Sequence, residues 1–504
     1  MRKKLVIGLT ILFSFFIYVL PVAAEDRQIE DEIMYEIIVD RYNNGDFSND
    51  IAVDVDDPAA YHGGDLIGIM DRLEDLAQIG VTTIVLSPIM ANMDDGFHGY
   101  WVEDFTEIDP QFGTFEELEQ LVEAAHEQDI KVVLEFVTNY IPEDHSIALD
   151  PQRADWVLTE EVTGPDWAER VVQFDQDNPD VQEYLIDAAS FWLDETKIDG
   201  LSLHAVDQSS IDFLNRLTTE LKESHPNKYL LGDILDEEAD IAEIMEHTSL
   251  DAIDNYQIGQ MISDIFSMPD QSPVEIYEIQ KEMSDFQSIL IVDDKYSKRF
   301  SQKFSENGRN IVTAWQLALT YMYTTPGTPL ILQGTEVGMY GETAEDSQRL
   351  VPLNSGDQDL MEFHERISSL RTEFPSLRHG DFELIDERDS YAVFKRTYEG
   401  ETMYIGINNG SESSYIDVTD VGPDMLFRGY LADNLARQNP EDNYRIGIPR
   451  ESVEVYQLMD DVGLNWTLII MVATILLGFV FVVVYLSKKQ KEQERKEADQ
   501  GIQK

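Results

Sequence analysis

The stretch Lys197-Ile198-Asp199-Gly200-Leu201-Ser202-Leu203-His204-Ala205-Val206 decides the fold. Its apolar residues fall at alternate positions, which predicts a short buried strand that ends in a polar side chain. In a (β/α)₈ barrel, the carboxyl ends of the strands carry the functional groups. The stretch therefore predicts a barrel strand that presents His204 at the functional end of the barrel.

Seven further segments have the same strand-like character, and helical segments lie between them. Residues 66–79 carry apolar side chains at helical spacing and stop at Gly80, and a β-branched run at 81–86 follows. Such strand–helix–strand units predict a parallel sheet. The remaining strand-like runs are residues 32–39, 130–137, 228–233, 250–256, 287–294 and the end of 318–339. The chain is therefore predicted to be an α/β protein with a (β/α)₈ TIM barrel.

The barrel is expected to occupy residues 25–375, with an excursion at 141–195 before the fourth strand. Short segments of alternating hydrophobicity follow, and they predict a C-terminal β-sandwich over residues 376–460. The length of 504 residues is sufficient for these two domains and a large core.

The two ends of the chain predict a membrane protein. Residues 1–24 have a basic start, an apolar run and small residues at the end, as in a secretory signal peptide. Residues 464–486 predict one transmembrane helix. Lysines follow directly, so residues 487–504 are expected to be a cytoplasmic tail. We therefore expect a single-pass type I protein of the cell membrane whose large domain is extracellular.

The composition excludes several classes of function. The chain has 36 Lys and Arg against 98 Asp and Glu, for a net charge of −62. Such a surface repels nucleic acid, so no nucleic-acid partner is expected. The chain has no cysteine, which excludes disulfides, thiolate metal sites and a cysteine nucleophile.

Several motifs resemble those of one enzyme family. Residues 97–105 contain His98-Gly99-Tyr100-Trp101, residues 318–339 contain Gly334-Thr335-Glu336-Val337-Gly338, and Arg299-Phe300 follows the seventh strand. Together with Gly200, these motifs resemble the α-amylase family of glycoside hydrolases, in particular cyclodextrin glycosyltransferases and neopullulanases. The resemblance covers roughly residues 30–458. It implies a role in carbohydrate metabolism with α-glucans or maltodextrins as ligands, and it identifies the 141–195 excursion with the family's small B domain.

The resemblance also implies which residues contact the sugar. The tyrosine of the His-Gly-Tyr-Trp segment stacks on the sugar at the cleavage position in this family. By that match His98, Tyr100, Trp101 and Arg299 are the expected substrate-binding residues. An aromatic ring can stack on a sugar without any catalytic carboxylate beside it.

The catalytic positions depart from the family pattern. His204 stands at the position of the nucleophilic aspartate, Asp233 at that of the glutamic general acid, and Tyr296 at that of the stabilising aspartate. In addition, Ser202 replaces an arginine and Lys295 replaces a histidine. Retaining glycoside cleavage needs two carboxyl groups about 5–5.5 Å apart. The substitutions therefore predict a pseudoenzyme with little or no hydrolytic activity.

A calcium site is expected near the first strand. Clustered Asp and Asn oxygens around glycine suit a hard cation, although such clusters also form ordinary turns. The segments at 40–50 and 61–66 resemble the calcium loop of cyclodextrin glycosyltransferases. The ligands implied by this resemblance are Asn44, Asp46, Asn49, Asp50, Gly63 and Asp65.

Three functions remain open from the sequence. The first is a membrane-anchored extracellular protein that recognises carbohydrate without cleaving it. The second is an active α-glucan hydrolase or transferase that uses Asp233 as its acid and recruits Asp207 or Glu135. The third is a non-enzymatic ectodomain that serves as the partner of another membrane protein.

Overall fold

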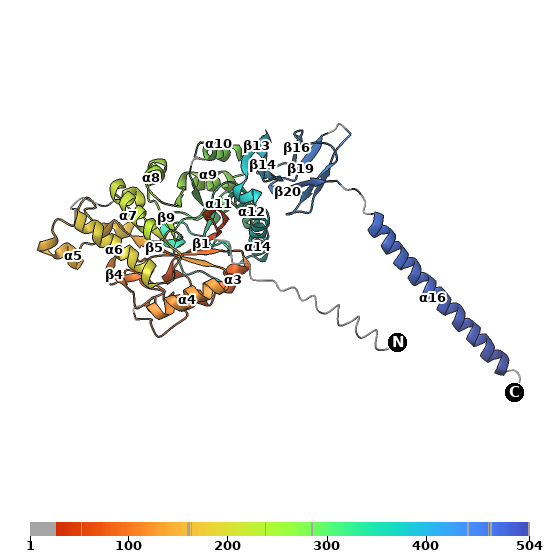
Figure 1. Cartoon of the computed structure of the whole chain (residues 1–504), viewed down its shortest axis with the longest axis horizontal. Helices are drawn as coiled ribbons and strands as arrows, with labels where there is room; N and C mark the ends of the chain where they lie inside the picture. Colours follow the sequence, from red (N-terminus) through yellow and green to blue (C-terminus); the bar gives the residue numbers. More distant parts are fainter. Residues whose placement is uncertain are drawn as a thin grey trace.

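The structure is a computed structural model that describes residues 27–501, except for 52, 159–161, 163, 237, 284–285, 441–442, 462 and 464–465. The predicted signal peptide, residues 1–24, lies outside the described residues. The remainder forms a barrel, a β-sheet domain and one long separate helix (Figure 1).

Eight strands close into a barrel in the order β1-β12-β11-β10-β9-β8-β5-β2. All neighbouring strands pair in parallel. In chain order the strands are β1 (Met34–Ile37), β2 (Thr83–Leu86), β5 (Lys131–Val137), β8 (Gly200–His204), β9 (Tyr229–Gly232), β10 (Ala252–Asp254), β11 (Ser288–Ile291) and β12 (Thr328–Leu332). The predicted (β/α)₈ barrel is therefore confirmed, and each strand falls within the segment that the sequence indicated.

Helices surround the barrel (Figure 1), and their buried apolar residues join those of the strands in one core cluster. The helices of the barrel domain are α2 (Leu66–Met70), α3 (Leu73–Gln78), α4 (Phe115–Glu127), α6 (Pro179–Glu195), α7 (Ile211–Ser224), α8 (Ile241–His247), α9 (Tyr256–Ser267), α10 (Val274–Glu282), α11 (Phe300–Glu306), α12 (Ile311–Thr324), α13 (Ala344–Ser347) and α14 (Gln358–Glu373). Burying this much apolar surface is the main favourable term in folding.

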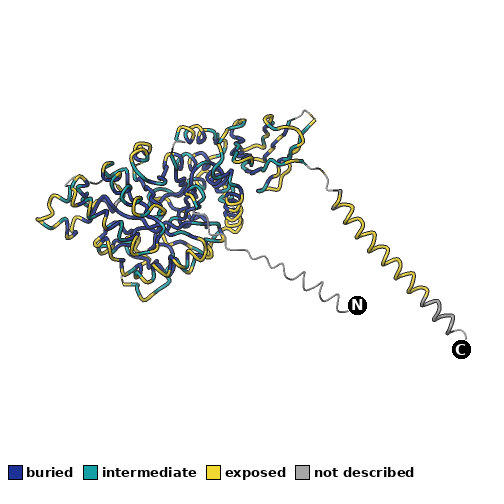
Figure 2. The backbone as a smooth tube through the Cα atoms, in the orientation of Figure 1, coloured by how far each residue is buried: buried dark blue, intermediate teal, exposed yellow. Residues whose placement is uncertain are grey.

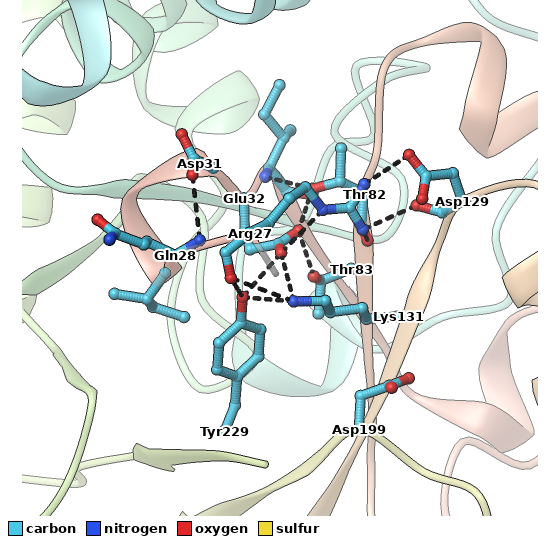
Figure 3. Close-up of polar contacts among 12 residues, drawn as sticks. Arg27, Gln28, Asp31, Glu32, Thr82, Thr83, Asp129, Lys131, Asp199 and Tyr229 are labelled. Carbon is cyan, nitrogen blue, oxygen red and sulfur yellow. Dashed lines mark hydrogen bonds and ion pairs between the residues drawn. The ribbon is translucent and has the colours of Figure 1, made fainter. Parts of the chain in front are cut away.

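A polar cluster closes the amino-terminal end of the barrel (Figure 3). Glu32 is fully buried there, and its carboxylate accepts hydrogen bonds from Thr82, Thr83 and Tyr229. Lys131 approaches the same carboxylate at 3.0 Å. Residues at the amino-terminal end of such a barrel contribute to stability, so functional groups are expected at the carboxyl end.

The excursion is shorter than predicted. Its irregular part comprises the hairpin β6 (Tyr140–Pro142) and β7 (Val171–Gln173) with α5 (Ser146–Leu149). The second half of the predicted 141–195 segment is the regular helix α6. The side chain of Asn178 accepts the backbone N–H of Asp180 and so caps this helix, and Pro179 occupies its first turn. Both residues favour a helix start, which explains why the excursion ends at residue 178.

The C-terminal domain is built of β-strands, as predicted. A six-stranded sheet has the order β13-β14-β15-β20-β17-β18, and β16 pairs with β19 in a second sheet. The strands are β13 (Asp381–Arg388), β14 (Tyr391–Tyr398), β15 (Glu401–Asn408), β16 (Ser414–Val418), β17 (Met425–Gly429), β18 (Leu435–Arg437), β19 (Tyr444–Ile448) and β20 (Ser452–Asp460). The short helix α15 (Ser376–His379) connects this domain to the barrel.

The last element is the helix α16 (Trp466–Gly501). Within it, Ile469–Glu492 is long and apolar enough to cross a membrane, and an 18-residue window of this stretch has a mean hydropathy of 2.9. Its residues are exposed along this length (Figure 2). This observation supports the predicted span by length and composition.

Candidate functional site

The residues at the expected catalytic positions meet at the carboxyl end of the barrel. His204 is the last residue of β8, and Asp233 directly follows β9. Ala205 has a φ of 50°, so the chain turns sharply directly after His204. Tyr296 lies in the loop after β11. The structure therefore places the three positions at the same end of the barrel.

His204 is the centre of a buried ion-pair network. Its Nδ1 atom lies 2.6 Å from Asp233 Oδ2 and 2.7 Å from Glu135 Oε1. Glu135 comes from the neighbouring strand β5, in which it pairs in register with Ser202. The imidazole therefore holds together two carboxylates from the strands on either side of β8.

Lys295 supplies the second cation of the network. Its Nζ atom donates to Glu135 Oε2 and to Glu36 Oε1, each at 2.8 Å. Glu36 belongs to β1, so this lysine links the loop after β11 to two strands across the barrel mouth. Lys295 is recognisable in the sequence as a substitution, but its partners are not.

The electrostatics keep these cations charged. Burial lowers the pKa of His204, but the hydrogen bonds and charges of Asp233 and Glu135 outweigh it and raise the pKa above its ordinary value. Likewise, burial opposes the charge of Lys295, yet Glu135 and Glu36 raise its pKa well above the ordinary value. These contacts favour the protonated imidazole at the position where the family pattern has an anionic nucleophile.

The carboxyl groups of the network divide into two kinds. Burial raises the pKa of Glu135, but Lys295 and His204 outweigh it and hold the pKa below its ordinary value. Burial raises the pKa of Glu36 and of Asp254, and the negative charge of Asp233 raises the pKa of Asp254 further. Glu135 is therefore the anion that compensates the buried cations, whereas Glu36 and Asp254 retain protons more readily.

Aromatic rings cover the network. Tyr100 is 3 % exposed, and its ring lies 4.4 Å from the His204 ring and 4.7 Å from that of Trp167. Its hydroxyl donates to Glu135 at 3.0 Å and lies 2.9 Å from the hydroxyl of Tyr296. The ring that was expected to stack on a sugar is therefore packed inside the protein.

A cleft of about 1280 Å³ opens above this cover. Phe97, His98, Trp101, Trp167, Asp207 and Tyr296 contribute to its lining. Of the three expected catalytic positions, only Tyr296 lines the cleft where the structure describes it. The cleft thus ends at Tyr296 and Trp167, and the ion-pair network lies beneath.

The predicted substrate-binding residues separate into two groups. His98 and Trp101 line the cleft. Tyr100 and Arg299 do not line it. Arg299 is fully buried, donates to the Ser347 carbonyl at 2.6 Å and lies 3.4 Å from Asp293. Arg299 therefore has a structural role, and the expectation that it contacts sugar is wrong.

The expected calcium residues lie together in one loop region. Asp65 is fully buried and accepts the backbone N–H groups of Asp46 and Gly68, so it caps α2. Asn44 Nδ2 donates to Asp50 Oδ1 at 2.9 Å. A side chain on Gly63, which has a φ of +88°, would collide with both groups. This close approach requires glycine.

Two buried amide oxygens in this region have no partner. They are Asn44 Oδ1 and Asn49 Oδ1. Buried polar atoms are normally satisfied, and amide oxygens are ligands that calcium prefers. The residues therefore fit a hard cation. Asp46 and Asp65 are the exceptions, because hydrogen bonds already engage both carboxylate oxygens of each. Ser48 engages those of Asp46, and the backbone N–H groups of Asp46 and Gly68 engage those of Asp65.

Comparison with known proteins establishes the class of the chain. The family model of the α-amylase catalytic domain matches residues 36–167 and 166–368, and that of the α-amylase C-terminal domain matches residues 380–456. The chain therefore belongs to the α-amylase family.

Individual relatives agree with this class. A cyclomaltodextrinase of Thermoanaerobacter pseudethanolicus is 26% identical over 421 residues, which cover 78% of this chain and 72% of the relative. The crystal structure of an Anoxybacillus α-amylase has a TM-score of 0.83 and 37% identity, and the match covers 87% of this chain and 100% of that one. An α-amylase of Geobacillus thermoleovorans, solved with acarbose, has a TM-score of 0.80 and 35% identity, with 86% and 100% covered.

Proposed function

We propose that this protein is a membrane-anchored extracellular member of the α-amylase family that binds α-glucans without hydrolysing them at the rates of the family. The observation that carries the proposal is the ion-pair network around His204. Its cations are bound by the carboxylates that would otherwise serve a reaction, and its aromatic cover separates them from the cleft.

The chemistry of glycoside cleavage supports the loss of activity. The transition state carries positive charge at the anomeric carbon, and a carboxylate nucleophile must face it. A protonated His204 opposes that charge. Asp233 is one methylene shorter than the expected glutamate, and a displacement of about 1 Å can cost on the order of 10²-fold in rate. Its carboxylate is also engaged by His204 at 2.6 Å.

The cleft supports the retention of glucan binding. His98 and Trp101 remain in its lining. The Trp101 indole N–H donates to the Trp167 carbonyl at 3.0 Å, which fixes the orientation of its ring. Since rings and a few oriented polar groups are sufficient to hold a sugar, this part of the site functions without the buried network.

Binding is tested on the full-length protein in detergent by titration with maltodextrin. We expect Trp101→Ala to weaken binding about 10-fold, which corresponds to about 1.4 kcal/mol. Trp156→Ala is the matched control, because Trp156 also has an arginine over its ring but does not line the cleft. Equal binding by both variants would place the glucan elsewhere, and no binding by the wild type would favour a role as partner of another membrane protein.

Calcium is proposed to hold the loop region that contains Asn44, Asn49, Asp50, Gly63 and Asp65. Calcium binds the folded state alone, so it should stabilise the protein by about 2.7 kcal/mol at a concentration 100 times its dissociation constant. We expect chelation to lower the melting temperature and Asp50→Asn to remove this calcium dependence. Asp46→Asn should preserve it, because the Asp46 side chain is bound to Ser48. A wild-type melting temperature that does not change when calcium is added or removed would contradict the proposed calcium site.

A further inference from the structure

The contacts of His204 have a feature that the absence of hydrolysis does not explain. Two carboxylate oxygens, one from Glu135 and one from Asp233, both approach the single Nδ1 atom, at 2.7 and 2.6 Å. One N–H group can point well at only one of them. All three ligand atoms lie within 4.8 Å of one another.

We infer that Glu135, His204 and Asp233 form a binding site for one divalent transition-metal ion, with zinc as the best match. The ligand types are one imidazole nitrogen and two carboxylate oxygens, a set that suits zinc and other first-row ions rather than calcium. The ion would take the place of the proton on Nδ1 and would bind both carboxylates at once.

The three ligands come from rigid elements. Glu135, His204 and Asp233 belong to or directly follow the neighbouring strands β5, β8 and β9, which are hydrogen-bonded in register. Their exposed fractions are 1%, 0% and 6%. Sites built on strands hold their ligands more accurately than sites on loops.

Neighbouring side chains orient the ligand carboxylates. Lys295 and Tyr100 donate to the two different oxygens of Glu135, at 2.8 and 3.0 Å. Asp254 lies against Asp233 and shares a hydrogen bond with it. Ligating groups are commonly held by such outer contacts, and removing them weakens metal binding about 10–100-fold.

The size and charge of the site suit a small ion. Ligands about 2.0–2.2 Å from zinc are roughly 3.3–3.6 Å apart in a tetrahedral arrangement, so His204 and the carboxylates would move apart by roughly 0.6–1.0 Å. Four carboxyl groups, of Glu36, Glu135, Asp233 and Asp254, lie around the single ammonium of Lys295. With a neutral imidazole, the two ligand carboxylates of Glu135 and Asp233 match the charge of a divalent ion, and Glu36 contacts the lysine at 2.8 Å.

This inference does not depend on the proposed glucan binding, because metal binding is measured without sugar. Full-length protein in detergent is stripped with chelator, returned to excess calcium to fill hard-cation sites, and titrated with Zn²⁺ and with Co²⁺. We expect one tightly bound ion per chain at this site and, for Co²⁺, a visible absorption band typical of low coordination.

The variant His204→Gln removes the nitrogen ligand but can still donate to a carboxylate. We expect it to bind Zn²⁺ at least about 100-fold more weakly and to lose the Co²⁺ band. The control is His126→Gln, which removes a surface histidine that also contacts a carboxylate, Asp199, at 2.8 Å. If His204→Gln fails to fold, Asp233→Asn provides the same comparison. A wild type without a stoichiometric ion, or an ion retained in both site variants, would overturn the inference.

Discussion

Replacing Lys295 by methionine is expected to lower the free energy of unfolding by about 3–5 kcal/mol, because it leaves buried carboxylates without their cation. The lysine is 4% exposed and holds Glu36 and Glu135, each at 2.8 Å. Methionine fills a similar volume, so the loss reports the charge rather than a cavity. Urea unfolding measures this loss in the free energy of unfolding. Lys298→Met is the control, because the Lys298–Glu306 pair is exposed and such pairs contribute about 0–1 kcal/mol.

The same loss should depend on pH. Lys295 and His204 lower the pKa of Glu135 in the folded protein to about 2, from an ordinary value of 4.5. A carboxyl group with a lowered pKa contributes stability that is fully present above pH 4.5 and is lost as the pH falls through the folded value. The difference between the wild type and Lys295→Met should therefore be largest near neutral pH and shrink below pH 4.5. A difference that is constant with pH would mean that packing, and not charge, causes the loss.

Replacing His204 by aspartate, the residue of the family pattern, is expected to destabilise the protein by about 3–5 kcal/mol. The new carboxylate would face Glu135 and Asp233, which approach the present imidazole at 2.7 and 2.6 Å. The only nearby cation left in the network would be Lys295. His204→Gln is the control, because it removes the cation without adding an anion, and its loss should be clearly smaller.

Ser202 allows a second experiment on the effect of an aspartate at position 204. It lies two residues before His204 on β8, so both side chains point to the same side of the strand. The family pattern has an arginine at the serine position. We expect Ser202→Arg to recover part of the stability that His204→Asp loses, as a coupling energy of about 0.5–3 kcal/mol in a double-mutant cycle. Additive effects of the two substitutions would show that the barrel mouth is no longer built for the family's ion pair.

The barrel could be predicted because its signals are local. Each strand is a short apolar run followed by a turn, so the eight segments and their common functional end follow from the sequence pattern. The end of the excursion was missed, although Asn178 and Pro179 form a helix-start signal within the predicted segment. The buried role of Arg299 could not be read from the motif, since the motif gives a position along the chain but not the depth of the side chain.

The partners in the network could not be predicted because they are distant in the sequence. Lys295 binds Glu135 and Glu36, which precede it by 160 and 259 residues. One signal was available: Glu36 is a lone charge inside the apolar run of residues 33–39, and a charge buried in a strand needs a partner. No sequence pattern indicated that Trp167 would cover the network. Trp167 lies in the excursion, and the sequence does not specify the path of that segment.

The most direct test measures the reducing ends that the full-length protein in detergent releases from maltodextrin, in calcium, beside the variant Asp233→Asn. We predict no release above the background of this variant, together with binding of maltodextrin that Trp101→Ala weakens. The general acid alone is worth about 10²–10⁴-fold, so even a slow enzyme would exceed the variant by a measurable factor. Turnover by the wild type that Asp233→Asn abolishes would contradict the central claim and would show that Asp233 serves an active hydrolase.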